Sequence, residues 1–530
     1  MTLQLASSSS RGRRTHLARR AEAAIAVLGL AGAWQLLATT VFAGRHVIPP
    51  PGDVVSAMVR DRFYVADLGT TMWEAGRGWL IGNVAAVVLA MVALLVPRMS
   101  RGLQRFGAIT YCVPTVAIGP LLLIFLGPDA AKVLISALSV FFVSLVACLT
   151  GLSSTAQSSL DLVRAYGGGR ATELFRVRVR GAIPAATGGL ALSAPAAILG
   201  AIIGEYLGGD QGLGVAMVSA EESFQVPRTW AIGLVATAVS GLAYSAIKLA
   251  LRAVAGAPDT GTATSAAPAA GGVGRLRLLR RVLTPLTTLA GVVLVWAVAL
   301  RASGLSPYFA KSPAAVWSFL VTGPGAASNR GIALSALGTT MQDAMLGWLV
   351  GTVCAVAGAA VLVQVPRLGT AAMPIIMTLR SVPLVAMTPL VALVFGQGLL
   401  GVVVIAGIVS FVPSLVLVAS GLESVPPQAL ELARAYNMSG VATLVRVRAR
   451  YALPSLFAAT KVAMPGSILG AVLAEWLLTG DGLGHLMAAA LIGSDFNTLW
   501  SSVAIVSAVT LVLYGTVGYL ESASAATLSS

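Results

Sequence analysis

Side chains that could catalyse a reaction or bind a metal ion are scarce in this sequence of 530 residues. The histidines and cysteines are few and widely separated: His16, His46, His485, Cys112, Cys148 and Cys354. Their spacing fits neither a zinc site nor a disulfide framework. The three cysteines lie in apolar runs, where cysteine behaves as a small hydrophobic residue. We therefore expect no metal site and no disulfide.

The lysines exclude a nucleotide-binding loop. A phosphate-binding P-loop needs glycine directly before its lysine. The four lysines, Lys132, Lys248, Lys311 and Lys461, follow Ala, Ile, Ala and Thr. We expect no catalytic residue and no cofactor in this chain, and any ATP hydrolysis that drives it must come from separate subunits.

Two arginine-bearing segments are the most informative part of the sequence. They read DLVRAYGGGRATELFRVRVRGAIP (161–184) and ELARAYNMSGVATLVRVRARYALP (431–454), with 11 of 24 positions identical. In each, apolar residues recur at helical spacing, a short polar or glycine-rich break follows, and a basic helical stretch ends at proline. The break requires a left-handed residue, which Gly167 and Asn437 supply.

A basic loop often only anchors a membrane protein on one side of the bilayer. The similarity of the two segments, in a chain whose halves otherwise differ, favours a surface for a partner protein. Because the segment occurs twice, we expect two copies of the partner.

The elements that position these loops must be membrane helices. Apolar residues make up 57% of the chain and charged residues only 10%, with a mean hydropathy of +0.87. Soluble proteins carry about 25% charged residues, because their surface faces water. The chain is therefore expected to be an all-α polytopic membrane protein.

Twelve apolar runs approach the roughly 20 residues that a membrane helix needs. They lie near 22–43, 76–97, 105–127, 132–153, 187–207, 229–250, 282–301, 345–365, 371–396, 399–420, 455–478 and 498–519. The first could be a signal peptide, but it is longer than a typical signal core, so we expect it to remain as a span. The expected units are a basic tail (1–20), a first membrane domain (21–252), a flexible linker (253–276) and a second membrane domain (277–530).

The charge pattern predicts the orientation. The net charge of +15 comes almost entirely from arginine. The arginines lie in short runs between apolar stretches, which disfavours nucleic-acid binding and fits the positive-inside rule. Acidic residues, Glu205 and Asp210 among them, lie in the alternate loops. We expect a multi-pass protein of the cell (inner or plasma) membrane with both termini in the cytoplasm.

The chain is an internal duplication. Leu68 to Met72 (LGTTM) recurs as Leu337 to Met341 at an offset of 269 residues, and from residue 161 the offset becomes 270. Six spans per copy make this a parallel repeat, in which the pathway is expected between the halves.

The two basic segments resemble the EAA loop of binding-protein-dependent ABC importer permeases. Matching residues are Ala165, Gly167, Ile183 and Pro184 in the first copy, and Glu431, Ala433, Leu453 and Pro454 in the second. Asp161, Val163 and Asn437 depart from the family pattern. The resemblance implies type I, MetI-like units of six helices each, two per chain. It implies docking of two cytoplasmic ABC ATPase subunits on a set of loop residues. These are Asp161, Ala165, Gly167, Arg176, Pro184, Glu431, Ala433, Ala435, Asn437, Arg446 and Pro454.

Further segments are similar to the nitrate/sulfonate/taurine type of these permeases. They are 114–127, 383–396, and the EYLGGDQGLG and EWLLTGDGLG segments that begin at Glu205 and Glu475. The resemblance implies an extracytoplasmic binding protein that contacts Glu205, Asp210, Glu475 and Asp481. Residues expected to line the pathway are Thr115, Pro120, Met387, Thr388 and Pro389.

Several readings remain open for function. The resemblance favours a small anion such as nitrate, bicarbonate, taurine or an alkanesulfonate, and it also covers importers of riboflavin or thiamine-pyrimidine precursors. An ion-coupled secondary carrier with twelve spans is the main rival. Such carriers place ionisable groups in mid-membrane, whereas these spans have almost none. A non-transport scaffold would not explain the duplicated loop.

Overall fold

The structure is a computed structural model of the chain, which describes most residues between 29 and 528. Outside the described residues are 1–28, 30, 33, 41–47, 62–63, 96–101, 104–105, 108–109, 113–114, 154–156, 170–171, 256–289, 292, 295, 299, 302–303, 366–367, 370–387, 389–390, 393 and 529–530.

Within the described residues the regular elements are helices, and they repeat. In the first half they are α2 (Pro51–Arg60), α3 (Tyr64–Leu95), α5 (Thr115–Ser153), α6 (Gln157–Ala165), η1 (Glu173–Arg178), α8 (Val179–Gly208), α9 (Leu213–Glu222) and α10 (Val226–Ala255). In the second half they are α12 (Pro313–Trp317), η2 (Ser318–Thr322), α13 (Ala326–Gln364), α16 (Leu399–Glu423), α17 (Pro427–Ala435), α18 (Gly440–Thr443), η3 (Leu444–Arg448), α19 (Ala449–Leu478), α20 (Gly482–Ile492) and α21 (Phe496–Leu528).

Eight of the described helices are long and apolar enough to cross a membrane. They contain the expected spans at 76–97, 132–153, 187–207, 229–250, 345–365, 399–420, 455–478 and 498–519, or nearly all of each. Of the other four expected spans, 22–43, 282–301 and 371–396 lie more than half outside the described residues. Most of 105–127 is described, and its residues 115–127 form the first part of α5. The count of twelve therefore stays a prediction.

Two of these helices begin well before the sequence suggested. The spans expected at 76–97 and 345–365 begin at Val65 and Ala326. Their first turns carry polar residues such as Thr71 and Glu74, which lower the local hydropathy but are buried by neighbouring helices.

Glycines let neighbouring helices approach closely in both halves. A Cβ atom on Gly82 would contact the carbonyl oxygen of Ala137 in α5, and one on Gly351 would contact that of Gly407 in α16. Small residues of this kind favour helix association in lipid, where burial of apolar surface gives no driving force. The same contact recurs at offsets of 269 residues for the two glycines and 270 for their partners, which shows that the two halves share one packing scheme.

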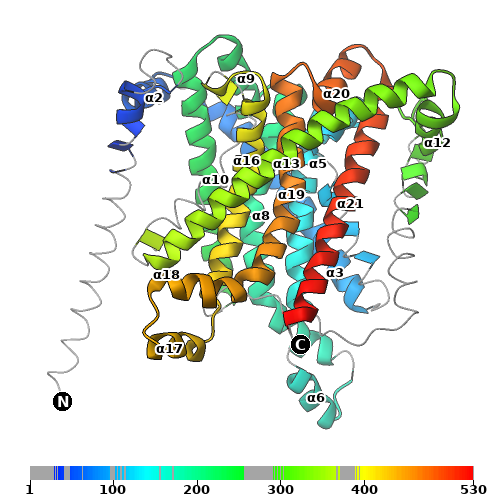
Figure 1. The fold of residues 1–530 in the computed structure, drawn as a ribbon. Coiled ribbons are helices and arrows are strands. Elements are labelled where there is room, and N and C mark those ends of the chain that lie inside the picture. Colours follow the sequence, from blue (N-terminus) through cyan, green and yellow to red (C-terminus); the bar gives the residue numbers. More distant parts are fainter. Residues whose placement is uncertain are drawn as a thin grey trace.

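The loops of the bundle separate into two ends. Figure 1 shows α6 and α17 at one end, together with the end of α21, while α9 and α20 lie at the opposite end. We call the first the basic end, because its loops carry Arg164, Arg176, Arg434 and Arg446, and the second the acidic end, after Asp210 and Asp481 in its loops.

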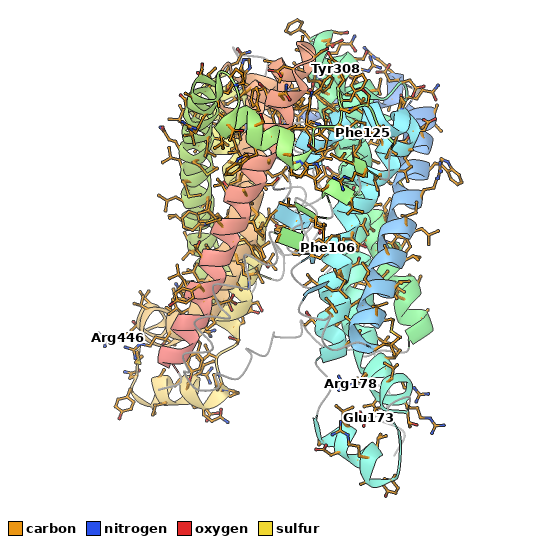
Figure 2. All side chains as sticks on the ribbon, turned by 90° about the vertical axis from the view of Figure 1, so that its right-hand side faces the viewer. Phe106, Phe125, Glu173, Arg178, Tyr308 and Arg446 are labelled. Atoms are coloured by element: carbon orange, nitrogen blue, oxygen red, sulfur yellow. The ribbon has the colours of Figure 1, made fainter. Side chains whose placement is uncertain are left out.

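The halves meet through α5, α8 and α19. Leu121 of α5 belongs to the apolar core of the second half, and Leu473 of α19 packs with Ile135 and Ile203 of the first. The Tyr111 hydroxyl donates a hydrogen bond to the carbonyl of Val462 at 2.9 Å. In Figure 2, Arg446 of one half and Arg178 of the other lie at the same end, and Phe125 and Tyr308 lie toward the opposite end.

The break before the fourth span of each half is at a glycine. Gly127 has φ +76 and Gly396 has φ +86. Pro120, seven residues before Gly127, lies inside α5 without breaking it. A single proline removes one backbone hydrogen bond, which neighbouring groups in a bundle can offset, whereas a positive φ redirects the chain.

The left-handed residues predicted in the basic loops are confirmed. Gly167 has φ +74 and Asn437 has φ +52. In both copies the residue closes the short helix: Gly167 N–H donates to the Arg164 carbonyl at 2.9 Å, and Asn437 N–H donates to the Arg434 carbonyl at 2.9 Å.

The expectation that the basic helical stretch ends at proline is wrong. Pro184 lies inside α8 and Pro454 inside α19. The π-helical segments η1 and η3 continue directly into these long helices. Each proline lies near the start of its helix, where the loss of one hydrogen bond does not stop thirty helical residues.

The turn at Asn437 gives a first prediction. Replacement of Asn437 by valine places a β-branched residue at positive φ, at a cost of about 1–2 kcal/mol. Amide hydrogen exchange within 427–448 should accelerate in Asn437→Val. Asn437→Gly is the control and should keep the wild-type rates, and equal rates in both variants would show that the turn does not constrain this loop.

Candidate functional site

Each basic loop is a short helix, a tight turn and a basic π-helical segment. The loops are α6 to η1 in the first half and α17 to η3 in the second. All the predicted docking residues except Ala433 are exposed. The exposed ones are Asp161, Ala165, Gly167, Arg176, Pro184, Glu431, Ala435, Asn437, Arg446 and Pro454. Ala433 is buried, and its carbonyl accepts the Met438 N–H at 3.0 Å.

Two exposed apolar side chains at each short helix, a leucine within it and a tyrosine directly after its last residue, were missed as candidates. Leu162 is 59% exposed and Tyr166 86%; Leu432 is 60% exposed and Tyr436 76%. Residues four apart on a helix are neighbours, so each pair presents one apolar patch at the tip of the loop. The identical leucine, arginine, alanine and tyrosine in both copies were the available signal.

The loops differ in one internal contact. In the first, the Arg164 guanidinium Nε donates to Glu173 Oε1 at 2.7 Å. Thr443 stands at the corresponding place in the second loop. There Arg448 instead donates to the carbonyl of Leu422 at 2.7 Å and ties η3 to the end of α16.

At the acidic end, a buried carboxylate anchors the following helix in each half. Glu205 in the last turn of α8 accepts the Gly214 N–H at 2.7 Å, and Glu475 of α19 accepts that of Gly484 at 2.9 Å. These N–H groups belong to the first turns of α9 and α20, which have no partner within their own helix. A carboxylate there also interacts favourably with the helix dipole.

A threonine from a third helix completes each anchor. Thr71 of α3 accepts the Leu213 N–H at 2.9 Å, and Thr340 of α13 accepts the Leu483 N–H at 2.8 Å. The Thr340 hydroxyl also donates to Glu475 at 2.8 Å. Three helices of each half are thus joined at the start of one short helix.

The glycines of the repeated Gly-Leu-Gly sequence make room for the carboxylates. Gly212 has φ +119 and Gly482 φ +90. A Cβ atom on either would collide with the carboxylate of Glu205 or Glu475. A Cβ atom on Gly484 would collide with the carbonyl oxygen of Val472.

Of the four residues expected to contact a binding protein, two are exposed and two are buried. The side chain of Asp210 is 82% exposed, and Asp481 is also exposed. Glu205 and Glu475 are only 1% and 0% exposed. Their carboxylates lie inside the protein and bind the backbone at the start of α9 and α20. Direct contact of Glu205 or Glu475 with a partner is therefore not possible in this conformation.

Five charged residues of the spans are buried in the described part of the chain: Glu74, Lys132, Glu205, Asp343 and Glu475. Glu74, Lys132 and Asp343 were not among the candidates. Lys132 Nζ lies 2.7 Å from Glu74 Oε1. The interior of the spans therefore holds more charge than expected, although all five residues lie in helices that meet at the acidic end. Each of the three missed residues is a single charge near or within an apolar run, and nothing in the sequence around it indicates that it is buried.

The predicted pathway residues are only partly described. Pro120 and Thr388 are buried. Met387 and Pro389, as well as the Thr115 side chain, lie outside the described residues. A role for this group in the pathway stays a prediction.

Gly484 gives a second prediction. In Gly484→Ala the new methyl group meets backbone, which cannot move aside cheaply, so stability should fall by about 1–3 kcal/mol. The thermal unfolding midpoint of the purified protein measures it. Gly480→Ala is the matched control, because no atom lies within 4 Å of the added Cβ; equal midpoints would contradict the packing argument.

Glu221 gives a third prediction, on pH. Burial raises the pKa of this carboxyl from 4.5 to about 8, with a smaller raising effect from Glu222, while the hydrogen bond from Tyr206 lowers it. Once the pH is high enough to ionise Glu221 in the unfolded chain, its burial in the folded chain lowers the free energy of unfolding. Its unfavourable contribution should be absent below about pH 4.5, grow up to about pH 8 and then level off.

The comparison that tests this is Glu221→Gln against wild type. The thermal unfolding midpoint of Glu221→Gln should exceed that of the wild type by an amount that grows between about pH 4.5 and pH 8. Glu222→Gln, the adjacent exposed acid, is the control; because Glu222 makes only a minor contribution to the pKa of Glu221, the growth should be much smaller there. An advantage that does not depend on pH would exclude Glu221 as the titrating group.

Comparison with known proteins agrees with this architecture. A model of the family "Binding-protein-dependent transport system inner membrane component" matches twice, at residues 78–257 and 346–524. A probable ABC transporter permease protein of Haemophilus influenzae is 30% identical over 220 residues, which are 40% of this chain and 88% of that protein.

Two further relatives are named for the solutes that they transport. A formylaminopyrimidine transport permease protein of Halalkalibacterium halodurans is 23% identical over 218 residues, 41% of this chain and 87% of that protein. A putative aliphatic sulfonates transport permease protein of Bacillus subtilis is 23% identical over 212 residues, 39% of this chain and 76% of that protein. The matched relatives correspond to a single half. With two family matches that together cover more than half of its length, the chain belongs to the inner membrane components of binding-protein-dependent transport systems.

Proposed function

We propose that this chain forms by itself the translocation unit of an ABC importer, with its two halves in the place of two separate permease subunits. The observation that carries this proposal is the pair of basic loops. Both lie at the same end of the bundle (Figure 1), and each continues without a break into a helix that reaches the opposite end.

The basic end faces the cytoplasm in this proposal, with both chain termini on that side. The arginines of the loops support it through the positive-inside rule. Two ATPase subunits dock on the loops and hydrolyse ATP, and this chain contributes no catalytic residue and no cofactor of its own. The exposed pairs Leu162–Tyr166 and Leu432–Tyr436 supply apolar contact, ringed by Asp161, Glu431 and the loop arginines.

The acidic end faces the binding protein. Asp210 and Asp481 are exposed there and support charged contacts with it. Closure of the ATPases would push the loops, and α8 and α19 would carry that motion to α9 and α20 through the carboxylate anchors. The pathway is expected between the halves, where α5 meets α19.

For the substrate we propose a small anion, such as a sulfonate, taurine, nitrate or bicarbonate. The relative named for aliphatic sulfonates supports this class. The relative named for formylaminopyrimidine supports the second candidate, a vitamin precursor. The ion-coupled carrier was considered because such carriers have two similar sets of spans. The two family matches explain the two sets without it.

The fourth prediction tests the docking loops. Reconstitute the chain in vesicles with its ATPase subunits and binding protein, and measure ATP-dependent uptake of labelled taurine and formylaminopyrimidine. Asp161→Lys and Glu431→Lys should each weaken ATPase binding by about tenfold or more, because each replaces an exposed carboxylate of the proposed contact surface by a positive charge.

The control is Asp53→Lys, an exposed acid of α2 at the acidic end. It should keep ATPase binding at the wild-type level. Uptake without ATPase subunits, or ATPase binding that ignores both loop substitutions, would overturn the proposal. Uptake of one solute and not the other decides between the two substrate classes.

A further inference from the structure

A cavity of about 310 Å³ lies near the acidic end of the second half. It is bounded by η2, by the first turns of α13, by α20, which lies at that end (Figure 1), and by the start of α21. Phe319, Ile332 and Leu486 line it with apolar groups, and Ser501 and Ser502 of α21 are among its polar lining residues. Its volume is at the lower end of the roughly 300–1,000 Å³ of ligand pockets, so a small molecule or one part of a larger molecule fits it.

The hydroxyl groups of Ser501 and Ser502 lack hydrogen-bond partners in the described part of the chain. Each serine is only 1% exposed. Buried polar groups are nearly always hydrogen-bonded; on the same helix, the Thr510 hydroxyl donates to the carbonyl of Val506 at 2.7 Å. Two adjacent unpaired hydroxyls that line one cavity therefore indicate a ligand that forms hydrogen bonds there.

The duplication identifies the equivalent place in the first half. Phe224 and Ser494 have φ +53 and +56, and each lies two residues before its helix, α10 or α21. Trp230 and Trp500, further along these helices, each pack against a second tryptophan, with ring centroids 5.5 and 5.3 Å apart. Both pairs set the offset between α10 and α21 at 270 residues.

The first half fills this place with larger side chains. The residues that correspond to the two serines are Ala231 and Ile232, which are both 0% exposed and belong to the apolar core against which α2 packs. Arg228, whose Nε lies 3.2 Å from Asp61 Oδ2, corresponds to Thr498, which lines the cavity. The second half therefore has shorter side chains and more hydroxyl groups at this place.

The charge at the cavity limits its ligand. Among the described residues that line it, only Asp495 is charged. The carboxylate of Asp495 accepts hydrogen bonds from the first turn of α21, among them that of the Thr498 hydroxyl at 2.6 Å. Because no basic side chain is present in that lining, nothing offsets the desolvation of an anion. Serine hydroxyls can donate hydrogen bonds, so an uncharged group with carbonyl oxygens fits.

The depth of the cavity indicates where such carbonyls come from. The span Phe496–Glu521 has 26 residues, or about 39 Å at 1.5 Å per residue, close to the roughly 40–45 Å of a bilayer with its headgroup layers. Ser501 and Ser502 lie about 8 Å from its start, and each headgroup layer is roughly 5–8 Å thick. Ile332 lines the cavity and is 54% exposed, so the cavity reaches the surface of the bundle. At this depth a phospholipid has its ester groups.

We propose that this cavity binds the glycerol-ester region of a membrane phospholipid. The hydroxyls of Ser501 and Ser502 donate hydrogen bonds to the ester carbonyl oxygens. Phe319 and Leu486 contact the first methylene groups, and the acyl chains leave the cavity past Ile332. The headgroup stays outside, where the exposed Asp495 favours a zwitterionic lipid over one with a net negative charge.

The site does not depend on the proposed transport function and is tested on the purified chain in detergent. Native mass spectrometry counts the phospholipids that stay bound. The thermal unfolding midpoint is measured with and without dioctanoylphosphatidylcholine. The lipid should raise the midpoint by on the order of 2 °C or more, because it binds only the folded chain. Dioctanoylphosphatidylglycerol should raise it less, and free glycerol at the same concentration should not raise it.

Variants assign the effect to the cavity. Ser502→Ile copies the first half and fills the space, so it should lose the bound lipid and the midpoint shift. The double variant Ser501→Ala, Ser502→Ala removes the hydroxyls without filling the cavity, should weaken the shift, and serves if Ser502→Ile does not fold. Ser507→Ala is the matched control, because the Ser507 hydroxyl of the same helix also lacks a hydrogen bond but does not line the cavity. It should respond as wild type does.

Three results would overturn the proposal. If no phospholipid stays bound and neither lipid raises the midpoint, the cavity holds only water. If the shift is the same in Ser502→Ile, in the double variant and in Ser507→Ala, the lipid binds elsewhere. If free glycerol raises the midpoint as much as the lipids do, the ligand is a free polyol and not a membrane lipid.

Discussion

The acidic end depends on one constraint: a carboxylate buried at the end of a membrane helix must find donors. Glu205 and Glu475 find them in the first N–H groups of the next short helix, which are themselves without partners. Because each group satisfies the other, α9 and α20 can begin only where the carboxylate is. The positive φ of Gly212 and Gly482, and the threonines of α3 and α13, follow from the same requirement.

The same helices connect this end to the basic loops. α8 and α19 begin directly after the π-helical segments of the loops and end at the carboxylates. A displacement at one end of such a helix is transmitted to the other, since its backbone hydrogen bonds are internal and its close-packed neighbours resist bending. This continuity gives a physical route between the place where ATPases are proposed to act and the place where a binding protein is proposed to sit.

Duplication explains the common framework, and later divergence explains the differences. Both halves keep the anchor, the left-handed turn and the glycine contacts between helices. They differ where a charge is balanced locally: Glu173 pairs with Arg164 in the first loop, and Lys132 pairs with Glu74 at the first acidic end. Thr443 and Val402 stand at the places of Glu173 and Lys132 in the second half. The halves are therefore alike in architecture and unequal in electrostatics.

The sequence by itself determined the membrane class, the duplication, eight spans that the structure describes and the left-handed positions of Gly167 and Asn437. These depend on hydropathy, periodicity and local backbone sterics, which act over a few residues. Tertiary structure alone decided that Glu205 and Glu475 lie beneath their loops, that Pro184 and Pro454 lie within continuous helices, and that Lys132 meets Glu74. Burial and ion pairing join residues tens of positions apart, and only the packing of whole helices brings such residues together.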